Sequence, residues 1–190
     1  MKMKSYRNIL SGLLSSLAIV FGTLTAVAAE PPQIGGAAPD FSLNTLDSKS
    51  VSLSAETAKL PVVLVVLRGW PGYQCPLCTR QVHDFVEQAG AFAGKARVIM
   101  VYPGPSENLQ AHAEEFLKSK QWPKGFLFVT DPAFTFTKSY GLRWEAPGET
   151  SYPSTFVMDA KGKVQFAKVS KSHGGRASAA EALAALEKIK

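Results

Sequence analysis

The chain is poor in the side chains that bind metal ions and form disulfides. Its 190 residues include only two cysteines and three histidines. The cysteines, Cys75 and Cys78, stand in a single CxxC, so the chain can form at most one disulfide within itself. A closed zinc site needs four ligands, and only His83, His112 and His173 could complete one. Because His112 and His173 lie far from the pair in sequence, we expect neither a bound metal nor a cofactor.

The chain also lacks a strong excess of charge once its first residues are set aside. The formal net charge is +6, with 21 Lys and Arg against 15 Asp and Glu. Lys2, Lys4 and Arg7 stand in the first ten positions; without them 18 basic residues face 15 acidic ones, a net charge of +3. No basic stripe with interleaved aromatic residues is present, so we expect no nucleic-acid partner.

Residues 1–29 have the three-part pattern of a secretory signal peptide. A basic start, "MKMKSYRN", precedes the apolar run "ILSGLLSSLAIVFGTL" and the small residues "TAVAAE". Val27 and Ala29 suit cleavage before Glu30, and no cysteine follows the run to carry a lipid. We therefore expect export, to a bacterial periplasm, without stable membrane association after cleavage. An uncleaved membrane anchor is the alternative.

A single domain is expected after the signal segment. Residues 30–40 form a Pro/Gly-rich linker and loop, and residues 41–190 show no internal repeat or domain boundary. Short strands are predicted in 41–54, buried strands in 61–70, 96–103 and 125–131, and a hairpin in 154–170. Helices are predicted in 79–94, where either Gly90 or Gly94 can end the helix, and in 109–120, 132–141 and 176–190. This alternation, with a CxxC between the first long strand and its helix, predicts an α/β domain with a thioredoxin-like fold: a central mixed sheet with helices on both faces.

The position of the CxxC favours a redox couple. The first turn of a helix stabilises a thiolate through its unpaired N–H groups and the helix dipole. Pro76 suits that turn, since it has no N–H to lose. Arg68 and Arg80 are near enough in sequence to add positive potential. Half of a metal site and a passive disulfide are the alternatives, but a bridge closing so small a loop would constrain the unfolded chain very little.

Four segments together resemble the AhpC/TSA branch of the peroxiredoxins, in the thioredoxin superfamily. They are "IGGAAPDFSL", "VVLVVLRGW…CPLC", "STFVMDAKGKV" and "KSHGGRASAAEALAAL", and the match runs from Ile34 to Lys190. The resemblance implies an antioxidant thiol oxidoreductase that reduces hydroperoxides through a Cys75–Cys78 dithiol/disulfide cycle. It also implies an external thiol or a thioredoxin-like protein as the electron donor.

The resemblance leaves the roles of the two cysteines open. The family carries its peroxide-reducing cysteine in a Pro-x-x-x-Thr-x-x-Cys motif, and Pro71 to Cys78 has this spacing with Cys75 in place of the Thr. On this register Cys78 attacks the peroxide and Cys75 resolves the resulting sulfenic acid. Thioredoxin-type chemistry assigns the reverse roles, with Cys75 as the attacking residue.

Two departures from the family bear on the substrate. The motif Thr is missing, and Pro153 replaces the Arg that peroxiredoxins place before the "STF"-like strand. Arg68 or Arg143 is the expected substitute cation. Pro153 stands where thioredoxin-like disulfide reductases have a cis-proline, which favours the alternative of a protein thiol–disulfide oxidoreductase with Cys75 as nucleophile. Trp70 either offers an apolar surface to a substrate or packs against neighbouring loops.

A third hypothesis comes from a different functional class. Some exported thioredoxin-like proteins bind copper through two cysteines and a distant histidine. Here His112 or His173 would have to supply the third ligand of a copper-binding or copper-chaperone module. Those proteins typically have one more residue between the cysteines, which counts against this hypothesis.

Overall fold

The computed structural model describes residues 1, 29–118 and 120–189. The expected signal segment, apart from Met1 and Ala29, therefore lies outside the described residues. None of the helices found in the described part of the chain is long and apolar enough to span a membrane.

Seven strands form one mixed sheet in the order β2-β1-β5-β4-β3-β6-β7. They are β1 Ser42–Thr45, β2 Ser50–Ser52, β3 Val62–Val66, β4 Arg97–Gly104, β5 Phe126–Pro132, β6 Ser154–Met158 and β7 Val164–Val169. Strands β3, β4 and β5 are parallel to one another, while the remaining pairings are antiparallel. The predicted mixed sheet is confirmed.

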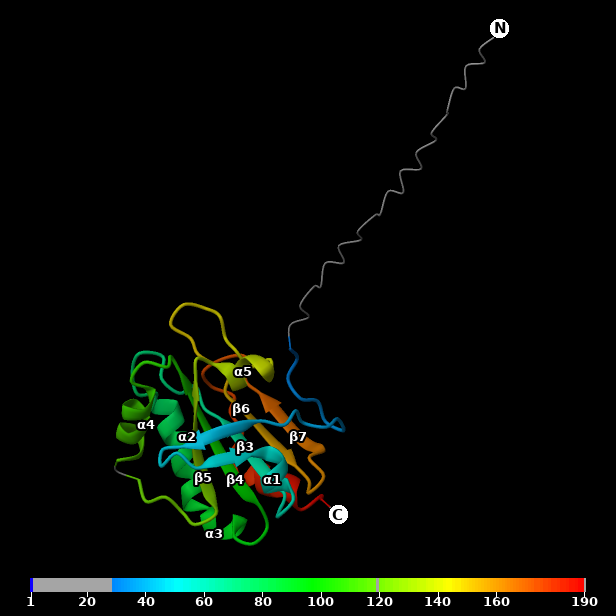
Figure 1. The fold of residues 1–190 in the computed structure, drawn as a ribbon. Coiled ribbons are helices and arrows are strands. Elements are labelled where there is room, and N and C mark those ends of the chain that lie inside the picture. Colours follow the sequence, from blue (N-terminus) through cyan, green and yellow to red (C-terminus); the bar gives the residue numbers. More distant parts are fainter. Residues whose placement is uncertain (2–28, 119, 190) are drawn as a thin grey trace.

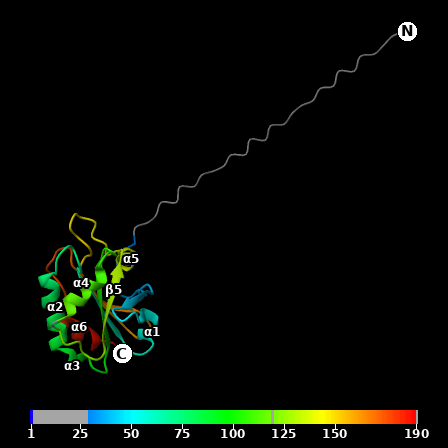
Figure 2. The ribbon, with the colours of Figure 1, turned by 60° about the vertical axis from the view of Figure 1, so that its left-hand side comes forward.

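Helices cover both faces of the sheet (Figures 1 and 2). They are α1 Leu53–Thr57, α2 Pro76–Glu87, α3 Ala89–Phe92, α4 Leu109–Leu117, α5 Thr135–Ser139 and α6 Ala179–Leu186. One apolar cluster joins the sheet to α2, α3, α4 and α6, and a second joins its other face to α1 and α5. The helix predicted from residue 79 to Gly90 or Gly94 ends earlier, at Glu87, and a short helix, α3, follows it; the last predicted helix is shorter at both ends.

The position of β3 inside the sheet, between β4 and β6, explains its composition. Successive side chains of a strand point to opposite faces, so Val63 and Val65 enter one cluster while Val62, Leu64 and Val66 enter the other. All five are fully buried. A β-branched run without polar alternation therefore lies buried on both faces, as the sequence predicts.

Backbone hydrogen bonds hold the loop after β3 against β4. The N–H of Leu67 donates to Val101, and the N–H of Trp70 donates to Pro103 at 2.9 Å. Between them Gly69 has φ +69°, and a Cβ there would lie 1.9 Å from the Pro103 carbonyl oxygen. Only glycine permits this approach, because any side chain would collide with the backbone of β4. The chain then turns into α2 with the cysteine pair at its start.

Candidate active site

The first turn of α2 is built around the two cysteines. Cys75 is the N-cap residue and Pro76 occupies the first helical position. The N–H of Cys78 donates to the Cys75 sulfur at 3.3 Å, so a thiol takes the place that a Ser or Asp oxygen usually fills at a helix start. Both cysteines are free thiols and buried, with 3% and 0% of their surface exposed.

The two thiols differ in their ionisation. A hydrogen bond from the Cys78 thiol is the largest influence on Cys75; with the Cys78 N–H and the charges of Arg176 and Arg68 it outweighs burial and lowers the Cys75 pKa to about 5. Burial raises the pKa of Cys78 well above its ordinary value, and its bond to Cys75 acts in the same direction. These opposite shifts favour Cys75 as the thiolate of the pair and Cys78 as its protonated hydrogen-bond donor.

Arg176 is the cation that contacts both sulfurs. One terminal nitrogen lies 3.7 Å from the Cys78 Sγ and donates to Gln81 Oε1 at 3.0 Å. The other lies 3.8 Å from the Cys75 Sγ. Arg176 comes from the loop between β7 and α6, and it is not among the residues expected from the sequence to lie at the site. The guanidinium therefore spans the pair from one side.

Strand topology could have identified this arginine. Strand β7 is antiparallel to β6, which is antiparallel to β3, so β7 and β3 run in the same direction. The loop that follows β7 must then lie at the same edge of the sheet as the CxxC that follows β3. Arg176 is the cation of that loop nearest to α6.

Arg68 lies beside the site but is held by other partners. It is only 4% exposed. Its Nε donates to Glu149 Oε2 at 2.7 Å, and its terminal nitrogens donate to the Tyr73 hydroxyl at 2.5 Å and the Gly148 carbonyl at 3.0 Å. Its charge lowers the Cys75 pKa from a distance.

Arg143, the other expected cation, is engaged within its own loop. Its guanidinium donates to the carbonyls of Trp144, Glu149 and Thr150. It also lies over the ring of Phe134, with 4.2 Å between the guanidinium carbon and the ring centroid. None of these contacts involves a cysteine.

Pro153 lies directly before β6, at the same edge of the sheet as the cysteine pair. No peptide bond among residues 29–118 and 120–189 is cis, so the expectation of a cis-proline at this position is wrong. Pro153 is buried, and its carbonyl accepts the N–H of Ser170 at 2.9 Å. It thereby connects the start of β6 to the end of β7.

Trp70 packs onto α4 rather than standing open. Its ring stacks on His112 with centroids 3.6 Å apart and planes 9° apart. Gln74 reinforces this contact by donating to the His112 carbonyl at 2.8 Å. Of the two alternatives for Trp70, a surface for a substrate or packing against neighbours, the structure shows packing, here against a helix. Nearby Tyr73 is 50% exposed.

The histidines have partners other than the cysteines. His112 stacks on Trp70, His173 pairs with Glu149 at 2.8 Å, and His83 pairs with Glu87 at 3.1 Å. Over the described ranges, no three His, Cys, Asp or Glu side chains are grouped so that they could hold a metal ion. The geometry gives the copper hypothesis no third ligand beside the sulfurs.

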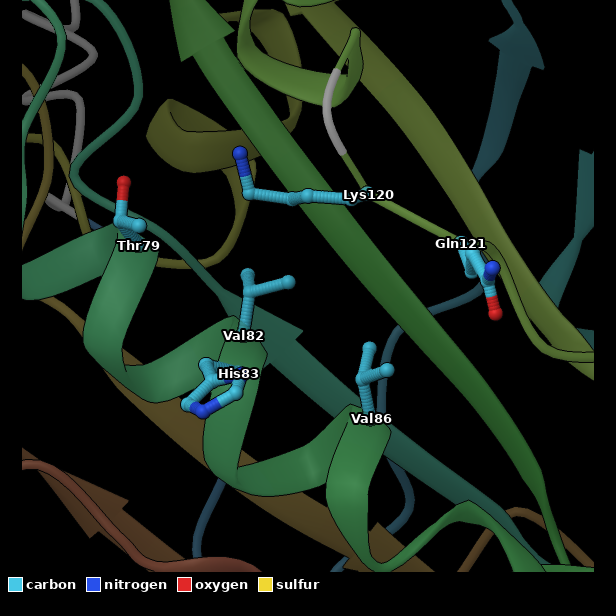
Figure 3. A pocket seen from close by; sticks show the side chains of 6 residues that line it. All are labelled: Thr79, Val82, His83, Val86, Lys120 and Gln121. Carbon is cyan, nitrogen blue, oxygen red and sulfur yellow. The ribbon is translucent and has the colours of Figure 1, made fainter.

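Two cavities flank α2. The first, of about 310 Å³, is lined by Arg176 and its neighbours in 173–178 and by Leu77, Arg80, Gln81 and Asp84. The second, of about 280 Å³, is lined on one side by Thr79, Val82, His83 and Val86 of α2 and on the other by Lys120 and Gln121 (Figure 3). The first cavity is lined by Arg176, whose guanidinium also contacts both cysteine sulfurs.

Comparisons with known proteins place the chain in a family. A family model described as Redoxin matches residues 33–185. Chloroplastic peroxiredoxin Q of Oryza sativa subsp. japonica is 30% identical over 132 residues, covering 70% of this chain and 57% of that protein. Chloroplastic peroxiredoxin Q of Triticum aestivum matches with the same identity and coverage. The chain thus spans little more than half the length of these curated relatives.

Solved structures give the same result for the fold. Peroxidoxin BcpB from Mycobacterium tuberculosis has a TM-score of 0.66 and 25% identity, with 84% of this chain and 99% of that chain covered. A peroxiredoxin-like protein from Aquifex aeolicus, at 17% identity, also has a TM-score of 0.66, covering 83% of this chain and 88% of that one. Since the family model covers most of the sequence, the chain belongs to the redoxin family, as a peroxiredoxin-like member of the thioredoxin superfamily.

Proposed function

We propose that the protein is a thiol-dependent peroxidase that reduces small hydroperoxides, with Cys75 attacking and Cys78 resolving. The observation that carries the proposal is the pair itself: a Cys75 thiol whose pKa is lowered to about 5, beside a buried Cys78 that stays protonated. Membership of the redoxin family supports a peroxide as the oxidant. The attacking thiolate has the lowered pKa that this chemistry requires.

The first step oxidises Cys75. Its thiolate attacks the terminal oxygen of the hydroperoxide, the O–O bond breaks, and the alkoxide takes a proton and leaves as an alcohol, or as water when the substrate is hydrogen peroxide. Cys75 becomes a sulfenic acid. The Arg176 guanidinium, 3.8 Å from this sulfur, offsets the thiolate charge and is close enough to stabilise the negative charge that develops on the leaving oxygen.

The second step forms the disulfide. Cys78 attacks the Cys75 sulfur, the S–O bond breaks, and the thiol proton of Cys78 leaves with the hydroxyl as water. Because the Cys78 thiol is already hydrogen-bonded to the Cys75 sulfur, this step needs no unwinding of α2. An external thiol or a thioredoxin-like protein then supplies two electrons to restore the dithiol.

Burial of the attacking cysteine favours a small substrate. Only 3% of Cys75 is exposed, so a hydroperoxide reaches the sulfur more readily than the disulfide of a folded protein does. The alternative, a protein thiol–disulfide oxidoreductase, has one observation in its favour: the low pKa belongs to the first cysteine of the CxxC, the attacking residue of thioredoxin-type chemistry.

Stopped-flow mixing of the reduced protein with hydrogen peroxide, followed by tryptophan fluorescence, tests the proposal. We expect a fast, stoichiometric signal that is lost in Cys75→Ser. In Cys78→Ser, one peroxide should still be consumed, leaving a sulfenic acid that a dimedone-type reagent traps at Cys75. A wild-type reaction no faster than that of a free thiol would reject the peroxidase and favour disulfide substrates.

Location is a separate proposal from the sequence. Export to a bacterial periplasm, with cleavage near Ala29, rests on the pattern of residues 1–29. N-terminal sequencing of the protein recovered from a periplasmic extract tests it. A chain that begins at Met1 and stays with the membrane fraction would instead support the uncleaved anchor.

A further inference from the structure

Three loops meet beside the cysteine pair. They are residues 67–74 after β3, residues 143–152 before β6 and residues 170–178 after β7. Backbone pairing brings them to one edge of the sheet, because Val66 lies opposite Ser154 and Ser154 lies opposite Val169. The loop before β6 is yellow at the top of Figure 1.

Glu149 joins the three loops through one carboxylate. Its Oε2 accepts Arg68 Nε at 2.7 Å, and its Oε1 lies 2.8 Å from His173 Nε2. The side chain is 12% exposed. Burial opposes the charge, but the bonds from Arg68 and His173 outweigh it and lower the pKa of Glu149. Glu149 is therefore an anion at neutral pH, held between the first and third loops.

His173 transmits this contact to the sulfurs. Its ring binds Glu149 and also lies 5.2 Å from the ring of Trp144, while its backbone carbonyl accepts Arg176 Nε at 2.9 Å. The terminal nitrogens of the same guanidinium contact Cys75 and Cys78. The position of the His173 backbone thus sets the plane of the Arg176 guanidinium over the pair.

The second support of Arg176 comes from α2. Gln81 accepts one terminal nitrogen at 3.0 Å and donates to the Ala177 carbonyl at 3.2 Å. This support secures the arginine from the helix side, whereas His173 secures it from the loop side. Loss of the His173 contact should therefore weaken the placement of Arg176 without removing it entirely.

We propose that Glu149 is a positioning residue: through His173 it holds the loop that places Arg176 across the two cysteine sulfurs. The inference deepens the proposed function and rests on it only for the role of Arg176 in peroxide reduction. The placement itself concerns the cysteine pair, whatever substrate the pair attacks. Glu149 acts without touching either sulfur.

The sign of one pKa shift separates positioning from direct electrostatics. If Glu149 acted only through its own charge, Glu149→Gln would remove a nearby anion and lower the pKa of Cys75. If it positions Arg176, the same substitution displaces the cation and raises that pKa. The titration follows the thiolate absorbance of the reduced protein in the ultraviolet, which requires no peroxide.

We expect Glu149→Gln to raise the Cys75 pKa from about 5 by about one unit. The matched control is Glu145→Gln, in the same loop. Glu145 is 74% exposed and pairs with Arg143 at 3.5 Å, so its loss should leave the titration unchanged. A fall or no change in Glu149→Gln, or an equal shift in the control, would overturn the proposal.

A second variant covers the case in which Glu149→Gln does not fold, since it leaves buried Arg68 without its anion. His173→Ala keeps the Arg68–Glu149 pair and cuts only the contact with the third loop. It should also raise the Cys75 pKa, but not in an Arg176→Met background, where no cation remains to be placed. An equal shift in both backgrounds would contradict positioning through Arg176.

The two proposals fail separately. A wild-type protein that does not react with peroxide, yet shows these shifts, would reject the peroxidase and retain the positioning role. A fast peroxide reaction of the wild type, with no shift of the Cys75 pKa in Glu149→Gln or His173→Ala, would retain the peroxidase and reject the positioning role of Glu149.

Discussion

Arg68 and Arg176 both act on the cysteine pair, yet their surroundings differ. Arg68 follows β3, is 4% exposed, and has all its bonds with Glu149, Tyr73 and Gly148. Arg176 follows β7, is half-buried, and points two nitrogens at the sulfurs. A buried, fully paired arginine stabilises a loop, whereas a half-buried one can respond to the charge of a reacting group. The difference predicts stability effects at Arg68 and chemical effects at Arg176.

The largest effect is expected from Arg176→Met. Loss of the cation beside both sulfurs should reduce the second-order rate with hydrogen peroxide by about 100-fold. Lys161→Met removes one positive charge from the exposed turn between β6 and β7, away from the cysteine pair, and should change the rate little. Equal losses in the two variants would show that net charge, and not the position of Arg176, determines the rate.

Arg68→Met should affect folding more than chemistry. It leaves the nearly buried Glu149 carboxylate without its arginine, and breaking a buried ion pair in this way costs about 3 kcal/mol of unfolding free energy. Urea denaturation measures this cost at constant pH. The comparison fails if Arg176→Met is destabilised as much as Arg68→Met.

The pH dependence of the peroxide rate should follow Cys75. With a pKa lowered to about 5, the thiolate fraction rises through pH 5 and is nearly complete one to two units above it, so the rate should level off there. In Arg176→Met the midpoint should move to higher pH, because the thiolate has lost a cation. A wild-type rate that keeps rising towards pH 9 would contradict a low Cys75 pKa.

Lysine substitutions give the smallest and most discriminating effects. Lysine keeps the charge but not the planar set of donors. Arg176→Lys should therefore retain part of the rate, within about tenfold of wild type, while Arg68→Lys should lose about 1 kcal/mol of stability with its extra hydrogen bonds. Full activity in Arg176→Lys would mean that the charge alone suffices.

Sequence patterns were sufficient to predict a strand or helix where local chemistry determines the structure. The buried run "PVVLVVL" became β3 with both faces covered, and Pro76 began a helix directly after Cys75. The same local rules failed where tertiary contacts decide. The helix predicted to end at Gly90 or Gly94 ends at Glu87, and a second helix starts at Ala89. The sequence left open whether Trp70 faces a substrate or packs, and its stacking partner, His112, lies on α4.

Arg176 could not be predicted from local sequence for the same reason, because a tertiary contact brings it to the site. Arg68 was selected because it is close to the pair in sequence, but Arg176 lies 98 residues from Cys78 and reaches it only through the direction of β7. Likewise, Pro153 occupies the predicted place before β6, but its peptide bond conformation depends on the folded surroundings and not on the dipeptide alone.

The central claim, that Cys75 is the thiolate of the pair, is tested most directly by titrating thiolate absorbance in the reduced protein and in both single serine variants. We predict one ionisation near pH 5 in the wild type, retained in Cys78→Ser, where the serine hydroxyl can replace the Cys78 hydrogen bond, and absent in Cys75→Ser. A low-pH ionisation that survives in Cys75→Ser and disappears in Cys78→Ser would contradict the claim and make Cys78 the attacking residue.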